Sequence, residues 1–301
     1  PRSTLFPYTT LFRSWDFNIH KHISQWVEAL ADQRVGKIDI NGRKAWKLLI
    51  DSVYTASSTP GQCPLINIRP TFGKYKTYYA NPHIKYDNKN LLDAIELLLA
   101  ANGTSHAYFF DVANITRQLL SNYYQQVFKD YEKAYNDRDR QSMKAKEKEM
   151  IDIMDDIDRL LASQSAFLVG KWISDARSWG VNHAESNYCE SNARNLITTW
   201  GDKDMLLNDY ASRTWAGLTK TFYAERWKMF FTAVDSALNS NETFDDEHYN
   251  AYKAKVTLFE KDWWEKRMHT FNSNPVGDSK IIAKELLEKY KAHILGKSTI
   301  R

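Results

Sequence analysis

Apolar residues recur every three or four positions along most of the chain, which is the spacing of one face of an α-helix. In the first half, this pattern predicts two helices over 19–34 and 41–55, one that Asp87 caps and Asn102–Gly103 ends, and two long ones over 107–135 and 141–162. Only a few polar residues separate the two long helices, so we expect these helices to lie antiparallel.

The same spacing continues through the second half. It predicts helices over 167–179 and 183–199, a long helix from Asn208 or Asp209 to about Asn239, and two more over 245–268 and 280–295. No useful run of alternating apolar and polar residues indicates a strand. The predicted fold is therefore all-α, an irregular bundle of about nine or ten helices, with one long loop near residues 57–86 that holds most of the prolines.

Composition supports helices and excludes several classes of function. The 301 residues include only 11 Gly and 7 Pro, so helix breakers are scarce. A net charge of +4 gives no basic field, and no apolar run is long enough to cross a bilayer, so we expect neither nucleic-acid binding nor a membrane span. The phosphate-loop, dinucleotide, zincin and serine-hydrolase motifs do not occur, and His20 and His22 point to different faces of a helix. We therefore expect no cofactor and no metal, whereas the count of two cysteines leaves Cys63 and Cys189 either free or paired.

The first fourteen residues differ in character from the rest. Residues 4–14, TLFPYTTLFRS, match the translation of a sequencing-library adapter. They lack the charged start, apolar centre and small-residue cleavage site of a signal peptide. We interpret residues 1–14 as a disordered, non-native scar and residues 15–301 as the helical domain, with the native gene extending upstream; a genuine disordered tail is the alternative.

The segment 192–226 offers the main candidate chemistry. It reads as a helix, a Trp-Gly stop, a short polar loop, an Asp cap and a second helix, which places Trp200 and Tyr210 at a helix end. An indole stacks on the apolar face of a pyranose, and a phenol supplies one directed hydrogen bond, so this pair suits a sugar pocket. The alternative is structural: Trp200 packs a corner between helices and Tyr210 belongs to the core.

Several motifs, taken in order, resemble one family. The pieces TWG, NDYA, WAGL and FYAERW lie between Thr199 and Trp227, and they follow WVEAL, AWKLLIDSVY, IRP, LLDAIELLL, DVANITRQLLSNYY and LVGKWISDAR. This order resembles the C-terminal helical domain of the α-N-acetylglucosaminidases, glycoside hydrolase family 89, from Trp15 to Ile294. The resemblance implies an exo-acting, retaining enzyme that removes terminal α-linked N-acetylglucosamine from glycans with two glutamates on a (β/α)8 barrel.

The resemblance also assigns a role to this segment. The barrel and both glutamates precede it in the family, so no catalytic residue is expected here and the chain alone is predicted to be inactive. Matching positions imply that Trp200 and Tyr210 line the substrate site, with Leu206 or Leu207 between them. Asp209 is interpreted as a helix cap and Glu225 as exposed or ion-paired. Family members are lysosomal in animals and exported in bacteria, to the periplasm or the outside, which sets the expectation for this chain.

Two other functions compete with that interpretation. A freestanding helical binding or scaffold module needs no catalytic group, and the sequence shows no self-contained one. A complete helical enzyme needs its own cluster, and although His106, Tyr108 and Arg117 are present, no spacing singles them out. A missing barrel further predicts an exposed apolar patch on this chain.

Overall fold

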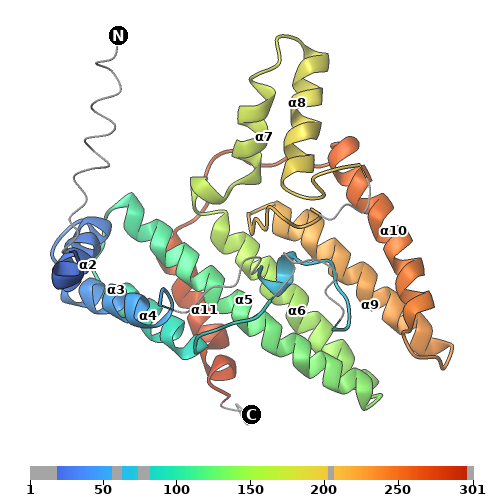
Figure 1. Cartoon of the computed structure of the whole chain (residues 1–301), viewed down its shortest axis with the longest axis horizontal. Coiled ribbons are helices and arrows are strands. Elements are labelled where there is room, and N and C mark those ends of the chain that lie inside the picture. The colour runs from blue at the N-terminus through green and yellow to red at the C-terminus, as the bar shows by residue number, and fades with distance from the viewer. Residues whose placement is uncertain (1–18, 56–62, 74–81, 203–206, 297–301) are drawn as a thin grey trace.

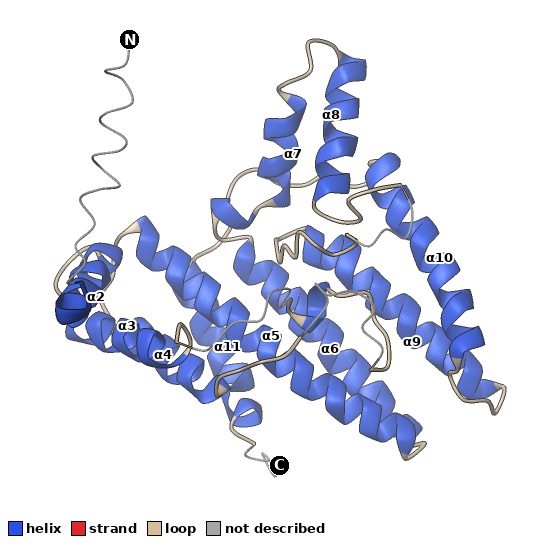
Figure 2. Cartoon of the chain, in the orientation of Figure 1, coloured by secondary structure: helices blue, strands red, loops and turns tan. Residues whose placement is uncertain are grey.

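The computed structural model describes residues 19–55, 63–73, 82–202 and 207–296. In these ranges the chain forms ten α-helices and no strand, which confirms the all-α prediction (Figure 2). The interpretation of residues 1–14 as a scar falls outside the described residues. The helices are α2 (Ile19–Val35), α3 (Ile40–Ser52), α4 (Asn88–Ala100), α5 (His106–Asn136), α6 (Arg140–Leu161), α7 (Val169–Arg177), α8 (His183–Leu196), α9 (Ala224–Asn239), α10 (Asp246–Glu265) and α11 (Ser279–Ile294).

The two long helices α5 and α6 form the centre of the molecule. They run antiparallel along each other as predicted, and α11 packs on both of them (Figure 1). Helices α2, α3 and α4 lie at one end, and α9 and α10 lie at the other (Figure 1). The hairpin of α7 and α8 projects away from the rest, and its base contacts α10 (Figure 1). Among the described residues, no helix is both long and apolar enough to cross a membrane.

Short polar side chains set where several helices begin. The Asp87 carboxylate accepts a hydrogen bond from the Lys89 backbone N–H at 2.8 Å, which confirms the predicted cap of α4. Ser105 Oγ accepts from the Tyr108 N–H at 3.0 Å, and Asp245 accepts from Glu247 and His248. Each cap satisfies backbone donors that the first helical turn leaves without a partner.

The long loop near residues 57–86 is anchored in the core rather than lying on the surface. Its described part contains a 3₁₀ turn, Leu65–Asn67, in which all three residues are buried. Trp227 of α9, which is fully buried, donates from its indole to the Ile66 carbonyl at 3.2 Å. The same indole packs edge-on against Tyr124 and Phe128 of α5, with 5.2 Å between ring centroids in both pairs. The loop thus joins α5 to α9 at the centre of the fold.

The predicted helix from Asn208 or Asp209 to Asn239 is wrong in its first third. Residues 207–217 form turns and irregular backbone, followed by a π-helical turn, Thr219–Tyr223, and then α9. The Asp158 carboxylate of α6 accepts from the Gly217 and Lys220 N–H groups at 2.7 and 3.1 Å, and so caps the helix at this later point. Similarly, the helix predicted over 167–179 begins at Val169, after a 3₁₀ turn over Ser165–Phe167.

Asp158 is expected to make stability depend on pH. Burial raises the pKa of its carboxyl from 3.8 to about 6, against the two backbone N–H groups that favour the charged form. The folded state therefore binds this proton more tightly than the unfolded chain. The contribution of Asp158 to the free energy of unfolding is full below about pH 4 and is lost as the pH rises through 6, by up to about 3 kcal/mol.

The measurement is urea unfolding of the chain and of Asp158→Asn at several pH values between 4 and 7. The difference in unfolding free energy between the two proteins should change across this range by the stated amount. A difference that stays constant with pH contradicts the shifted pKa of Asp158.

Candidate functional site

Four aromatic side chains surround an open cavity at the base of the α7–α8 hairpin. Its volume is about 990 Å³, and we call Trp172, Trp200, Tyr210 and Trp215 the aromatic corner. Trp200 is 39% exposed and Tyr210 is 46% exposed. Both rings therefore share one concave surface, and Tyr210 is not a core residue.

The four rings form two pairs. The centroids of Trp200 and Tyr210 lie 5.2 Å apart with an angle of 81° between the ring planes, an edge-to-face contact. Those of Trp172 and Trp215 lie 5.9 Å apart at 58°. The Trp172 indole N–H donates to the Ala193 carbonyl of α8 at 2.9 Å, which ties α7 to the neighbouring helix. Each ring is held by a neighbour, so the surface is fixed before any ligand arrives.

Trp200 occupies an unusual backbone conformation directly after α8. Its φ of +54° lies in the left-handed region, which a non-glycine residue adopts at a cost of about 1–2 kcal/mol. Its N–H donates to the Asn195 carbonyl at 2.9 Å, and Asn195 Nδ2 and Thr199 Oγ1 both donate to the Gly201 carbonyl, at 2.9 and 2.8 Å. These bonds hold the indole at the rim of the cavity instead of in the helix packing.

Tyr210 is positioned by the residue before it. Asp209 is buried, has a φ of +65°, and its N–H donates to the Thr198 carbonyl at 3.1 Å. Its carboxylate accepts from the Arg226 Nη1 at 2.7 Å and from the Arg69 backbone N–H at 2.9 Å. The prediction that Asp209 caps a helix is therefore wrong, because this carboxylate turns inward to a buried arginine while Tyr210 points outward.

Asp209 belongs to a buried network of four charged side chains. Arg226 also donates to Glu260 Oε1 of α10 at 3.0 Å, and Arg69 of the long loop donates to the same oxygen through Nε at 3.2 Å. Burial alone would lower the pKa of the Arg226 guanidinium, but the two carboxylates raise it above its ordinary value, so the group stays charged. The network connects the loop, α9 and α10 beneath the aromatic corner.

The structure brings together some of the residues that the sequence proposed. Trp200 and Tyr210 lie side by side, whereas Leu207 is half-buried, lies in the turn before Tyr210 and accepts the Tyr210 N–H at 3.0 Å, and does not line the cavity. Leu206 falls outside the described residues. Glu225 pairs with Lys228 at 2.7 Å, as expected for a surface residue.

Trp172 and Trp215 were missed by sequence reasoning. Trp172 lies in the LVGKWISDAR motif, and its place on the exposed side of a short amphipathic helix was the available signal. Trp215 fell within the helix predicted from Asn208 or Asp209, but residues 212–215 are not helical, and Trp215 lines the cavity.

The charged lining of this cavity does not suit glycoside hydrolysis by itself. The cavity is lined by one acid, Asp175, which pairs with Lys171 at 2.9 Å, and by the exposed Arg213. A retaining mechanism needs two carboxylates on either side of the scissile bond. Within the described part of the chain, no group of three His, Cys, Asp or Glu side chains is arranged to hold a metal, and both cysteines are free thiols.

Comparison with known proteins places the chain in a family. Residues 26–289 match the family described as the "Alpha-N-acetylglucosaminidase (NAGLU) C-terminal domain". The chain belongs to this family. Human α-N-acetylglucosaminidase is 29% identical over 277 residues, which cover 89% of this chain and 36% of the human protein.

Solved structures of a relative show the same fold. Two structures of a family 89 glycoside hydrolase from Clostridium perfringens, in complex with 2-acetamido-1,2-dideoxynojirmycin and with PUGNAc, give TM-scores of 0.77 and 0.78 at 26% identity. Each similarity covers 89% of this chain and 31% of the clostridial chain. This member of the α-N-acetylglucosaminidase C-terminal domain family thus spans about a third of the length of these relatives.

Proposed function

We propose that this domain forms an aromatic wall of the substrate site of an exo-acting, retaining α-N-acetylglucosaminidase. The observation that carries the proposal is the edge-to-face pair of Trp200 and Tyr210, half-exposed on one concave surface. A (β/α)8 barrel that precedes the domain supplies the two catalytic carboxylates, which the described lining of the cavity does not provide.

Each ring has a distinct task in this proposal. The Trp200 indole stacks on the apolar face of the terminal N-acetylglucosamine, and the Tyr210 hydroxyl forms one directed hydrogen bond to it. Leu206 rather than Leu207 is proposed to complete the wall between them, because Leu207 does not line the cavity. The strained backbone at Trp200 and the buried Asp209–Arg226 pair support this role, because both fix the rings in place without a ligand.

The relatives point to the same class of substrate. The clostridial enzyme has also been solved in complex with "its substrate GlcNAc-alpha-1,4-galactose", a structure that is 24% identical to this chain with a TM-score of 0.77. That protein and the human enzyme are both about three times as long as the matched segment. Family membership, together with the aromatic corner, favours this function over a freestanding scaffold.

Exposed apolar side chains support a neighbouring domain. At the tip of the α7–α8 hairpin, Trp179 is 82% exposed and Val181 87%, and Tyr188 in the second turn of α8 is 75% exposed. Large apolar groups gathered on one projecting element are typical of a surface that another protein segment covers. We propose that the preceding barrel packs against this side of the molecule.

The proposal that the barrel supplies the catalytic carboxylates and this domain only the aromatic wall is tested by assaying two proteins on 4-nitrophenyl α-N-acetylglucosaminide. One is the 301-residue chain, and the other is the longer protein that carries the same domain after its barrel. Only the longer protein is expected to release nitrophenol. Release of nitrophenol by the purified 301-residue chain alone contradicts the proposal.

A further inference from the structure

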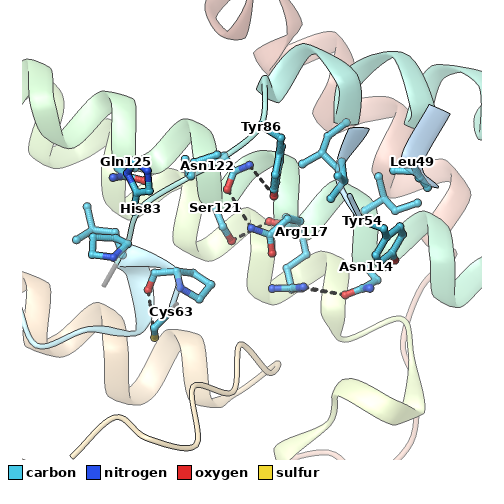
Figure 3. Close-up of a pocket in the computed structure, with 18 residues that line it drawn as sticks. Leu49, Tyr54, Cys63, His83, Tyr86, Asn114, Arg117, Ser121, Asn122 and Gln125 are labelled. Carbon is cyan, nitrogen blue, oxygen red and sulfur yellow. Dashed lines mark hydrogen bonds between the residues drawn. The ribbon is translucent and has the colours of Figure 1, made fainter. Parts of the chain in front are cut away.

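A second cavity lies between α3, α5 and the described parts of the long loop, and its lining residue Cys63 contacts Ser212 of the first cavity, with 2.7 Å between Sγ and Oγ. Its volume is about 350 Å³, and it shares no lining residue with the aromatic corner (Figure 3). Its wall combines apolar groups with uncharged polar ones, among them Tyr54, Tyr86, Asn114, Gln118, Asn122 and Gln125. A volume of this order is that of a small-molecule pocket.

Arg117 of α5 places a guanidinium in this wall. Its Nε and Nη2 both donate to the side-chain oxygen of Asn114, at 3.2 and 2.8 Å, and Figure 3 draws this contact. A guanidinium has five N–H donors, and Asn114 is a neutral partner that occupies only one edge. In the part of the chain that the structure describes, no other acceptor lies within hydrogen-bond distance of this group.

The positive charge of Arg117 also lacks a counter-charge. No Asp or Glu lines the cavity, and the segments 56–62 and 74–81, which adjoin its lining in the sequence, contain neither residue. Burial lowers the pKa of the Arg117 guanidinium to about 10, which leaves it charged at neutral pH. A desolvated cation with no anion beside it raises the free energy of the folded state.

The buried arginines of this chain show what Arg117 lacks. Among the described residues, three arginines are buried, and each pairs with a carboxylate: Arg69 with Glu260, Arg194 with Glu190, and Arg226 with Asp209. Arg117, which is half-buried, departs from this rule. Where the other three have a carboxylate, Arg117 has the neutral Asn114 amide oxygen, and it also lines the cavity.

We propose that this cavity binds an oxyanion, a carboxylate or a sulfate or phosphate group, through the guanidinium of Arg117. The edge formed by Nη1 and Nη2 is free to donate a bidentate pair of hydrogen bonds. Planar carboxylates and tetrahedral oxyanions can both accept such a pair. The Gln125 amide and the tyrosine rings contact the remainder of the ligand. The oxyanion belongs either to a free small molecule or to an acidic side chain of the polypeptide that precedes this domain.

The test measures the melting temperature of the 301-residue chain in chloride and in millimolar sodium sulfate or sodium acetate at equal ionic strength. At ten times the dissociation constant, the oxyanion should raise the melting temperature by about 3 °C, with saturation. Arg117→Met should abolish this shift and should melt higher than the unsubstituted chain in chloride, because it removes an uncompensated charge. Arg117→Lys keeps the positive charge but not the paired N–H donors of the guanidinium, so it should give a smaller rise in melting temperature.

Arg159→Met is the matched control, since it removes one positive charge from an exposed side chain and should keep the full shift. Equal shifts in the unsubstituted chain and Arg117→Met, as general salt effects produce, overturn the proposal. So does the absence of any shift with both salts.

The longer protein distinguishes the two sources of the oxyanion. With a free small molecule as the natural ligand, sulfate or acetate also raises the melting temperature of the longer protein, and Arg117→Met abolishes that rise. With an acidic side chain of the preceding domain in the cavity, added anions have no effect and Arg117→Met lowers the melting temperature. A longer protein that responds to neither change contradicts the proposal.

Discussion

Arg226→Met is expected to destabilise the domain by about 3–5 kcal/mol, which is the range for removing one partner of a buried ion pair. The guanidinium is fully buried and bonds to Asp209, Glu260 and the Asn67 carbonyl, the last at 2.8 Å. Without it, the Asp209 carboxylate is left in the core with only the Arg69 N–H. Urea unfolding followed by circular dichroism measures the loss.

A double variant separates the lost ion pair from lost packing. Arg226→Met combined with Asp209→Asn should recover part of the stability, because the stranded charge at position 209 is then removed. Arg140→Met, at a partly exposed arginine that pairs with Asp235 at 3.6 Å, should cost less than about 1 kcal/mol. If Arg226→Met costs no more than this control, the buried network does not support the fold.

Trp200→Ala in the longer protein is expected to lower kcat/KM for a terminal α-linked N-acetylglucosaminide by a factor of about ten to a few hundred. This factor corresponds to about 1–3 kcal/mol of lost transition-state stabilisation, the amount that one stacked indole supplies. The ring is half-exposed in the cavity wall, so the substitution removes a contact surface and little core packing. Initial-rate kinetics on an aryl glycoside, with the unfolding temperature checked beside it, give the factor.

Trp26→Ala is the matched control for that substitution. Trp26 of α2 is 51% exposed and lies outside the lining of the aromatic corner, so its loss should leave kcat/KM within about twofold. Unchanged kinetics in Trp200→Ala, or an equal loss in both variants, would remove Trp200 from the substrate site. A freestanding scaffold function would then gain support.

Most helices of this fold are predictable because their signals are local. The three-to-four-residue spacing of apolar positions located α5, α6 and α10, and Asp87 and Asp245 begin their helices as short-range chemistry requires. The antiparallel pairing of α5 with α6 followed from their short connection, whose residues leave no room for another arrangement.

Residues 207–217 could not be predicted in this way, because distant side chains decide their structure. Asn208 and Asp209 have the composition of a helix cap, yet Arg226 and Arg69 bind the Asp209 carboxylate. Asp158 instead caps the helix at Gly217 and Lys220. A single sequence does not show that these three residues meet there. The error had a direct consequence for the site, since it placed Trp215 on a helix face instead of in the cavity wall.

Of the four rings of the aromatic corner, the sequence predicted only the two that lie close together in the chain. Trp200 and Tyr210 flank one short loop, so the local sequence is enough to predict that they lie close together. Trp172 joins them because the α7–α8 hairpin folds back on itself, which depends on packing between helices. The charged network beneath the corner draws on four separate segments of the chain and carries no motif.

The central claim is that the rings of Trp200 and Tyr210 contact the sugar, and a crystal structure of the longer protein with 2-acetamido-1,2-dideoxynojirmycin tests it most directly. The account predicts the Trp200 indole within about 4 Å of the inhibitor ring and the Tyr210 hydroxyl within about 3 Å of one of its polar atoms. An inhibitor bound to the barrel with both rings facing solvent or another surface would contradict it.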